Sequence, residues 1–231
     1  MPSEQLPLPV PPSDDEGPAL HLPHRVVPMQ ATQIDAPFDD SDYFFEPWWP
    51  GVRAFALVER GHLRLQADGL ADATATFPEM AELLSQLGED GVVLDGTLLL
   101  LDDDGRPDGG LLRARLGGDA AAGHPAYVAS DLLWAGGQPV TRRTFRVRRR
   151  WLEALLAAGD RVTVGHGYVG DGTLVAEALA SLGIDGLSAR QLSARYRGGP
   201  AGPAWLRASI IPPEPRARPT LALILRLPLT D

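Results

Sequence analysis

The sequence predicts an α+β fold, and three features indicate it. Long apolar runs such as residues 92–101 are typical of buried strands. The Arg60-Gly61 pair between two strand-like runs is a hairpin signal, and two later segments place apolar residues at helical spacing. These elements follow one another in irregular order, which does not fit a regular βαβ repeat.

The first predicted elements are strands at residues 52–59 and 62–67, on either side of the Arg60-Gly61 turn. A helix is predicted over residues 78–84, because proline suits the first turn and Glu79 lies near the positive end of the helix dipole. A second pair of strands is predicted at residues 92–101 and 127–133, ended by Asp102-Asp103-Asp104-Gly105 and Gly136-Gly137.

Two amphipathic helices complete the predicted domain. Residues 145–158 carry Trp151, Leu152 and Leu155 at helical spacing, and residues 174–182 form a helix that Gly183 ends. The six arginines between positions 142 and 150 are interpreted as a solvated face opposite that apolar stripe, and a phosphate-contacting face is the alternative.

Both ends of the chain differ from this pattern. Residues 1–27 contain seven prolines and the acidic run Asp14-Asp15-Glu16, which predicts a disordered tail. The domain is expected to span residues 28–211, followed by a tail at residues 212–231 with one strand near residues 221–227. Because residues 221–225 are all apolar, we expect this strand to pair with the domain or with another chain.

Composition limits the functions that the chain can perform. The 231 residues have a net charge of -9, which disfavours unassisted nucleic-acid binding. No cysteine is present, which excludes disulfides and thiolate chemistry, and all 21 residues counted as Lys or Arg are arginine. No apolar run approaches the ~20 residues of a membrane span, so we expect no membrane contact and a cytoplasmic location.

One motif carries a resemblance to a known family. The segment Glu46-Pro47-Trp48-Trp49-Pro50-Gly51-Val52-Arg53 resembles the Lys-x-Asp-Gly-x-Arg motif of bacterial ATP-dependent DNA ligases, especially those of end-joining systems. In this alignment Trp48 stands at the lysine and Pro50 at the aspartate. Further similar segments follow in order, among them Thr74-Ala75-Thr76-Phe77-Pro78-Glu79 and Asp131-Leu132-Leu133-Trp134.

The resemblance implies the nucleotidyltransferase adenylation-domain fold, with two twisted, mostly antiparallel sheets and flanking helices around an ATP cleft. The oligonucleotide-binding barrel that follows in ligases is expected to be absent. The family reaction begins when a lysine amine attacks the α-phosphate of ATP. An indole offers no such nucleophile, and we expect Trp48 and Pro50 to occlude or reshape the cleft.

The resemblance also implies that the rest of the nucleotide pocket is degenerate. Thr97 replaces the glutamate of Asp-Gly-Glu, Ser130 replaces an adenine-stacking phenylalanine, and Asp68 replaces an arginine. In Asp185-Gly186-Leu187-Ser188-Ala189-Arg190 and Trp205-Leu206-Arg207-Ala208-Ser209, family lysines are replaced by Arg190, Arg207 and Ser209. The predicted degenerate pocket comprises Glu46, Trp48, Pro50, Gly51, Arg53, Asp68, Asp95, Thr97, Ser130, Asp185, Arg190, Arg207 and Ser209.

These observations predict an inactive adenylation domain, a pseudoenzyme that serves as a binding or scaffold module in DNA repair. It would have no catalytic residue, no metal and no cofactor, and its partner would be a protein or a second copy of the chain. One alternative is non-covalent binding of a nucleotide or DNA end, with weak affinity for ATP or AMP with Mg²⁺. Residual ligase activity is the other. Isolated histidines, the turn at residues 102–105 and the glycine-rich residues 165–172 are interpreted as structural.

Overall fold

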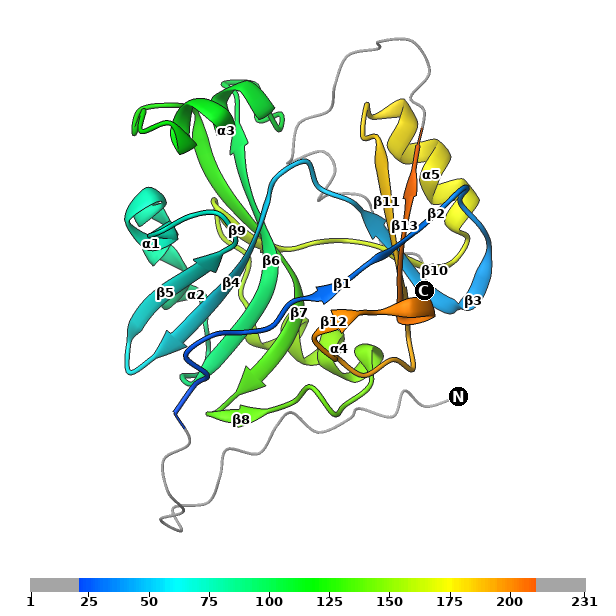
Figure 1. Cartoon of the computed structure of the whole chain (residues 1–231), viewed down its shortest axis with the longest axis horizontal. Coiled ribbons are helices and arrows are strands. Elements are labelled where there is room, and N and C mark those ends of the chain that lie inside the picture. Colours follow the sequence, from blue (N-terminus) through cyan, green and yellow to red (C-terminus); the bar gives the residue numbers. More distant parts are fainter. Residues whose placement is uncertain (1–20, 211–231) are drawn as a thin grey trace.

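The computed structural model describes residues 21–210 (Figure 1). Its strands and helices are interleaved along the chain, and the short segments Pro78–Glu82 and Gly202–Ala204 are 3₁₀ helices. The strands are β1 (Met29–Gln30), β2 (Thr32–Ile34), β3 (Asp40–Pro47), β4 (Val52–Glu59), β5 (His62–Ala67), β6 (Val92–Leu101), β7 (His124–Ala135), β8 (Gln138–Pro139), β9 (Val162–Val164), β10 (Tyr168–Gly170), β11 (Gly186–Gln191), β12 (Gly199–Pro200) and β13 (Trp205–Ser209). The α-helices are α1 (Ala73–Thr76), α2 (Leu83–Gln86), α3 (Gly109–Leu116), α4 (Phe145–Leu155) and α5 (Gly172–Ser181).

Two larger sheets organise the domain. One has the strand order β5-β4-β6-β7-β8, with β9 added beside β7, and the other has the order β10-β3-β11-β13-β2. Most neighbouring strands are antiparallel, whereas β9 runs parallel to β7 and β2 parallel to β13. This arrangement confirms the predicted pair of mostly antiparallel sheets. A small parallel pair, β1 with β12, is an addition that the sequence did not indicate.

Helices cover the outer side of each sheet, as Figure 1 shows for α4 and α5. The largest apolar cluster packs α4 and the segments around α1 and α2 against the six-stranded sheet, with Phe77, Met80 and Leu152 almost fully buried. A second cluster joins α5 to the five-stranded sheet through Phe45 and Leu187. The two sheets face each other where β4, β6 and β7 approach β3, β11 and β13, and the candidate site lies there.

Most predicted elements are confirmed, some with altered ends. The hairpin and the strand at residues 92–101 coincide with β4, β5 and β6. The helix predicted over residues 78–84 is a 3₁₀ segment followed by α2, and α4 ends at Leu155 instead of residue 158. Strand β7 is longer than predicted, because its first residues pair with the end of β6, with His124 opposite Leu101.

The predicted tail boundary at residue 27 is wrong, because residues 21–27 pack against the sheet. The Val26 backbone amide donates to Gln66 Oε1 at 2.8 Å, and the Gln66 side-chain amide donates to the Val26 carbonyl oxygen at the same distance. The Leu22 amide donates to Glu59, and Val26 is buried. The predicted strand at residues 221–227 lies outside the described residues. Within residues 21–210 there is no closed barrel, and no helix is long and apolar enough to cross a membrane.

Candidate functional site: a pocket between the two sheets

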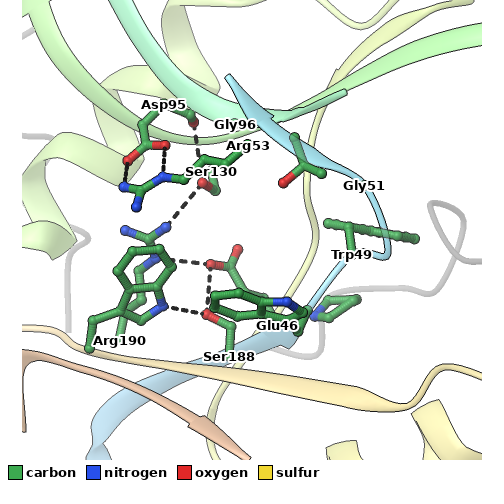
Figure 2. Close-up of a pocket in the computed structure, with 13 residues that line it drawn as sticks. Glu46, Trp49, Gly51, Arg53, Asp95, Gly96, Ser130, Ser188 and Arg190 are labelled. Carbon is green, nitrogen blue, oxygen red and sulfur yellow. Dashed lines mark hydrogen bonds and ion pairs between the residues drawn. The ribbon is translucent and has the colours of Figure 1, made fainter. Parts of the chain in front are cut away.

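A small pocket lies between the two sheets (Figure 2). Its volume is about 70 Å³, room for a few water molecules, whereas small-molecule sites usually measure ~300–1,000 Å³. Aromatic and charged side chains make up most of its wall. The lining residues are Glu46, Pro47, Trp48, Trp49, Gly51, Arg53, Asp95, Gly96, Thr97, Ser130, Ser188, Arg190 and Trp205.

The loop between β3 and β4 brings Trp48 to this pocket. The Trp48 amide donates to the Gly186 carbonyl oxygen at 2.9 Å, which fixes the loop to the start of β11. A little further on, Gly51 lies directly on β6, where a Cβ atom would be only 2.2 Å from the Leu98 carbonyl oxygen. Glycine is therefore required at position 51 by the close approach of two backbones.

The Trp48 ring is held in an aromatic and cationic stack. Its centroid lies 5.6 Å from that of Trp205, with an angle of 33° between the ring planes. The Arg207 guanidinium lies 4.4 Å from the Trp48 ring centroid. A tryptophan packed in this way removes much of its ~150–250 Å² surface from water, so Trp48 and Trp205 together fill space between the sheets.

Arg53 and Asp95 form an ion pair on the wall contributed by β4 and β6. Arg53 Nε donates to Asp95 Oδ1 at 2.9 Å, and a second guanidinium nitrogen donates to Oδ2 at 2.5 Å. Arg53 also donates to the Met29 carbonyl oxygen, and the Tyr196 hydroxyl donates to Asp95 at 3.4 Å. Burial alone would lower the pKa of Arg53, but Asp95 outweighs burial and raises it, so the Arg53 guanidinium stays charged.

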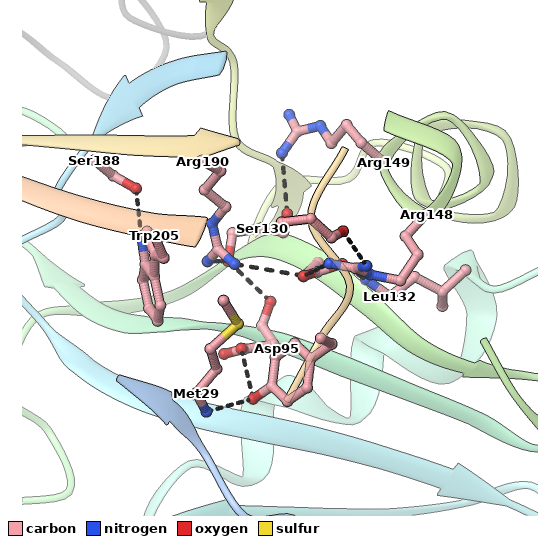
Figure 3. Close-up of polar contacts among 12 residues, drawn as sticks. Met29, Asp95, Ser130, Leu132, Arg148, Arg149, Ser188, Arg190 and Trp205 are labelled. Carbon is pink, nitrogen blue, oxygen red and sulfur yellow. Dashed lines mark hydrogen bonds and ion pairs between the residues drawn. The ribbon is translucent and has the colours of Figure 1, made fainter. Parts of the chain in front are cut away.

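Arg190 connects the two sheets at the centre of the pocket (Figure 3). From β11 it donates to Glu46 at 3.1 Å, to the Ser130 hydroxyl at 3.1 Å and to Asp131 at 3.4 Å. Its guanidinium also lies 4.0 Å from the Trp205 ring centroid. A planar guanidinium with five donors in a rigid fork suits these contacts, because it can donate to several acceptors while it stacks on an aromatic ring.

Two arginines of α4 complete this network from behind β7. Arg148 makes a two-point ion pair with Asp131, at 2.8 and 2.7 Å, and both side chains are almost fully buried. Arg149 donates to Glu46 at 3.4 Å and to Glu153 at 2.8 Å. The predicted solvated face is therefore wrong for Arg148 and Arg149. It failed because the helix turns these two inward, toward carboxylates that lie far away in the sequence.

The carboxylates of the pocket thus have internal partners. Asp95 is paired with Arg53, Asp131 with Arg148, and Glu46 with Arg190. The arginines on the pocket wall are therefore already neutralised, and a phosphate group would have to compete with a buried carboxylate for each of them.

Glu46 has a raised pKa, because burial disfavours its charged form more strongly than Arg190 and Arg149 favour it. A raised folded-state pKa means that the Glu46 contribution to stability is full below the unfolded pKa of ~4.3 and is lost as pH rises through the folded pKa.

We therefore expect the stability of the native chain, relative to Glu46→Gln, to increase as pH falls from neutrality toward 4.5. Urea denaturation of both proteins at a series of pH values measures this difference. A difference that is constant with pH, or that shrinks on acidification, would contradict the assignment.

Most residues of the predicted pocket do meet. The structure brings together eight of the thirteen along its wall, and they come from six different strands and loops. These eight are Glu46, Trp48, Gly51, Arg53, Asp95, Thr97, Ser130 and Arg190.

Two predicted residues lie away from the pocket. Pro50 is exposed and does not line the wall, so of the two residues expected to occlude or reshape the cleft only Trp48 lines the pocket. Asp68 lies at the end of β5, the edge strand, where it forms an exposed ion pair with Arg25 at 3.0 Å. Asp68 lines a separate surface groove, because β4 stands between β5 and the pocket.

Three further predicted residues lie outside the lining. Asp185 is exposed in the turn before β11, and Ser209 is exposed at the end of β13, where Gln33 donates to it at 3.5 Å. Arg207 contacts the pocket indirectly, by packing on Trp48. Positions 205, 207 and 209 share one face of β13, and Ala208 lies on the other face. Of the three, only Trp205 lines the pocket.

The sequence analysis missed several residues that build the site. Trp205 donates through Nε1 to the Ser188 hydroxyl at 2.9 Å, and both line the pocket. Tyr196 links Met29 to Asp95 from a loop without any motif. Trp205 and Ser188 lie within two segments that resemble family motifs, so the sequence did contain a signal for them. Tyr196 lies outside any such segment, and no sequence signal indicated it. No cluster of three or more potential metal ligands occurs within residues 21–210.

Two sheets around a pocket at their junction define an adenylation domain of the nucleotidyltransferase type. The family model of the ATP dependent DNA ligase domain matches residues 28–208, and the chain belongs to this family. Among solved structures, mycobacterial DNA ligase D complexed with ATP and MES is 28% identical, with a TM-score of 0.67 over 79% of this chain and 60% of that one. The ligase domain of Mycobacterium tuberculosis LigD is 26% identical, with a TM-score of 0.66 over 78% of this chain and 58% of that one.

Curated relatives agree with these structures. The multifunctional non-homologous end joining protein LigD of Mycolicibacterium smegmatis is 29% identical over 81% of this chain and 24% of its own length. A probable DNA ligase of Anaeromyxobacter dehalogenans is 33% identical over 68% of this chain and 32% of its own length. The chain thus spans about a quarter to a third of the length of these relatives, and it is related to the ligase part of end-joining proteins.

Proposed function

We propose that this chain is an adenylation-like domain that does not form a covalent adenylate and acts as a binding or scaffold module, in a DNA-repair context. The observation that carries the proposal is the position of Trp48. Trp48 lines the pocket and is the residue that the resemblance aligns with the family lysine, and its ring contacts Trp205 and the Arg207 guanidinium.

The chemistry of the family step supports this proposal. Formation of a lysyl-AMP needs an amine with a lowered pKa close to the α-phosphate, and groups that stabilise the phosphates. No lysine occurs at any of the 231 positions, so no neighbouring amine can replace the missing one. Arg53 and Arg190 are the cations on the pocket wall, and each is engaged by a buried carboxylate.

Non-covalent binding of a nucleotide or a DNA end is the second candidate. It is favoured by the fact that Glu46, Gly51, Arg53 and Asp95, which match the family motifs, still line one pocket. Its weakness is the pocket volume of about 70 Å³, well below the ~300–1,000 Å³ of usual small-molecule sites. Residual ligase activity is the least favoured candidate. We therefore propose no cofactor, with weak ATP or AMP binding in the presence of Mg²⁺ as the alternative.

Calorimetric titration separates the two leading candidates. With ATP, AMP or nicked DNA added in the presence of Mg²⁺ at low salt, we expect heats that do not differ from dilution. The mycobacterial DNA ligase D whose structure was solved in complex with ATP is the positive control for ATP. Saturable heats with ATP or AMP, lost in an Arg53→Met variant, would replace the scaffold proposal with nucleotide binding.

A further inference from the structure

Six exposed arginines lie on α4 and on two adjoining loops, the one that precedes α4 and the one that follows β11. Residues 141–146 and 192–196 are joined through backbone hydrogen bonds, for example from the Phe145 amide to the Ala194 carbonyl oxygen at 2.7 Å and from the Tyr196 amide to the Thr141 carbonyl oxygen at 3.0 Å. We call this surface the arginine face. Its members are Arg142, Arg143, Arg146, Arg150, Arg195 and Arg197.

The arginine face contains cations without anions. The stretches 132–152 and 186–209, which supply it, contain no aspartate or glutamate. Within residues 21–210, none of the six arginines forms an ion pair, whereas Arg148 and Arg149 on the opposite side of α4 are paired with Asp131, Glu46 and Glu153. Helix α4 therefore uses its inward arginines for the pocket network and presents the remaining arginines to solvent.

The charge of the whole chain restricts what this surface can bind. Net charge is -9, and exposed acids such as Asp39, Asp40 and Asp103 lie on other elements. A long nucleic acid would extend beyond the arginine face and meet the acidic surface around it. The negative net charge of the chain also opposes the approach of a polyanion. A short acidic peptide carries its charge locally, within the ~10 Å over which surface charges act at ordinary ionic strength. Guanidinium groups also bind carboxylates in a matching two-point geometry.

We propose that the arginine face is a docking surface for a short acidic segment of a partner protein. The proposal gives the scaffold module a partner class, and it does not depend on the absence of adenylation. Helix α4 would then have two separate roles. Arg148 and Arg149 pair with carboxylates at the pocket, whereas the exposed arginines of α4 contribute to the docking surface.

Fluorescence anisotropy with the full chain tests this assignment. The probes are a labelled peptide of alternating Glu and Ser, a matched peptide of Gln and Ser, and a single-stranded oligonucleotide of similar length. We expect the native protein to bind the Glu peptide more tightly than the other two. Arg142→Glu/Arg146→Glu/Arg195→Glu should weaken this binding about tenfold or more, because three charge-assisted contacts become repulsive.

The matched control reverses three exposed arginines elsewhere, Arg60→Glu/Arg64→Glu/Arg113→Glu, and therefore changes net charge equally. We expect it to weaken binding by no more than about twofold, since its sites lie outside the arginine face. A neutral set, Arg142→Gln/Arg146→Gln/Arg195→Gln, serves if the charge-reversed protein does not fold. Equal losses in both triple variants, no binding of the Glu peptide, or tighter binding of the oligonucleotide would each overturn the proposal. The last result would assign the surface to nucleic acid.

Discussion

Replacing Arg148 with methionine is expected to lower the free energy of unfolding by about 3–5 kcal/mol, because it leaves a buried carboxylate without its main partner. Arg148 and Asp131 are 2% and 0% exposed, and their two-point ion pair is the most buried in the described part of the chain. Arg148 also donates to the Arg143 carbonyl oxygen at 2.7 Å, so that bond is lost as well. Urea denaturation at neutral pH measures the change.

Arg150→Met is the matched control, because Arg150 lies two residues further along α4 and is exposed to solvent. We expect it to change stability by less than about 0.5 kcal/mol. A double variant, Arg148→Met/Asp131→Leu, should recover much of the loss, since neither charge then remains buried alone. A loss in Arg148→Met no greater than that in Arg150→Met would show that the buried network does not stabilise the fold.

Restoring the family motif is expected to leave the chain unreactive. Trp48→Lys/Pro50→Asp introduces an amine, but Thr97 and Ser130, which the resemblance places at the ribose acid and the adenine stack of the family, are unchanged. Each missing electrostatic partner typically costs ~10²–10³ in rate, and such losses do not simply add. Even one such factor would hide the reaction from an ordinary assay with labelled ATP.

The control for that experiment is the ligase domain of M. tuberculosis LigD, assayed under the same conditions. Thermal denaturation of the double variant must first show a folded protein, because Trp48 packs on Trp205 and its removal opens a cavity. Formation of a lysyl-AMP adduct at a rate near that of the control would mean that only the motif itself is missing, and would favour the nucleotide-binding candidate.

Local patterns predicted much of this fold. The hairpin of β4 and β5 and the strand β6 follow from apolar runs and a turn dipeptide, which act over a few residues. Pairings between distant segments, such as β1 with β12, leave no local signal, because each strand is only two residues long. Residues 21–27 were assigned to the tail because residues 1–27 as a whole are rich in proline, whereas hydrogen bonds between the Val26 backbone and the Gln66 side chain hold this segment in place.

The candidate site was predictable where motifs carried it. The motif containing Glu46, Gly51 and Arg53 and the one containing Asp95 converge on one pocket. The roles of Arg148 and Arg149 were not predictable, because a run of arginines does not reveal which members face Asp131 and Glu46. Asp68 was misplaced because an alignment position does not show that its strand is at the sheet edge.

The most direct test of the central claim is the intact mass of the full chain after incubation with ATP and either Mg²⁺ or Mn²⁺. The M. tuberculosis LigD ligase domain, treated in parallel, serves as the positive control. Because Trp48 lines the pocket and the chain contains no lysine, we predict a mass that does not change. A gain equal to one adenylyl group, labile to acid, would contradict the account and identify an active nucleotidyltransferase.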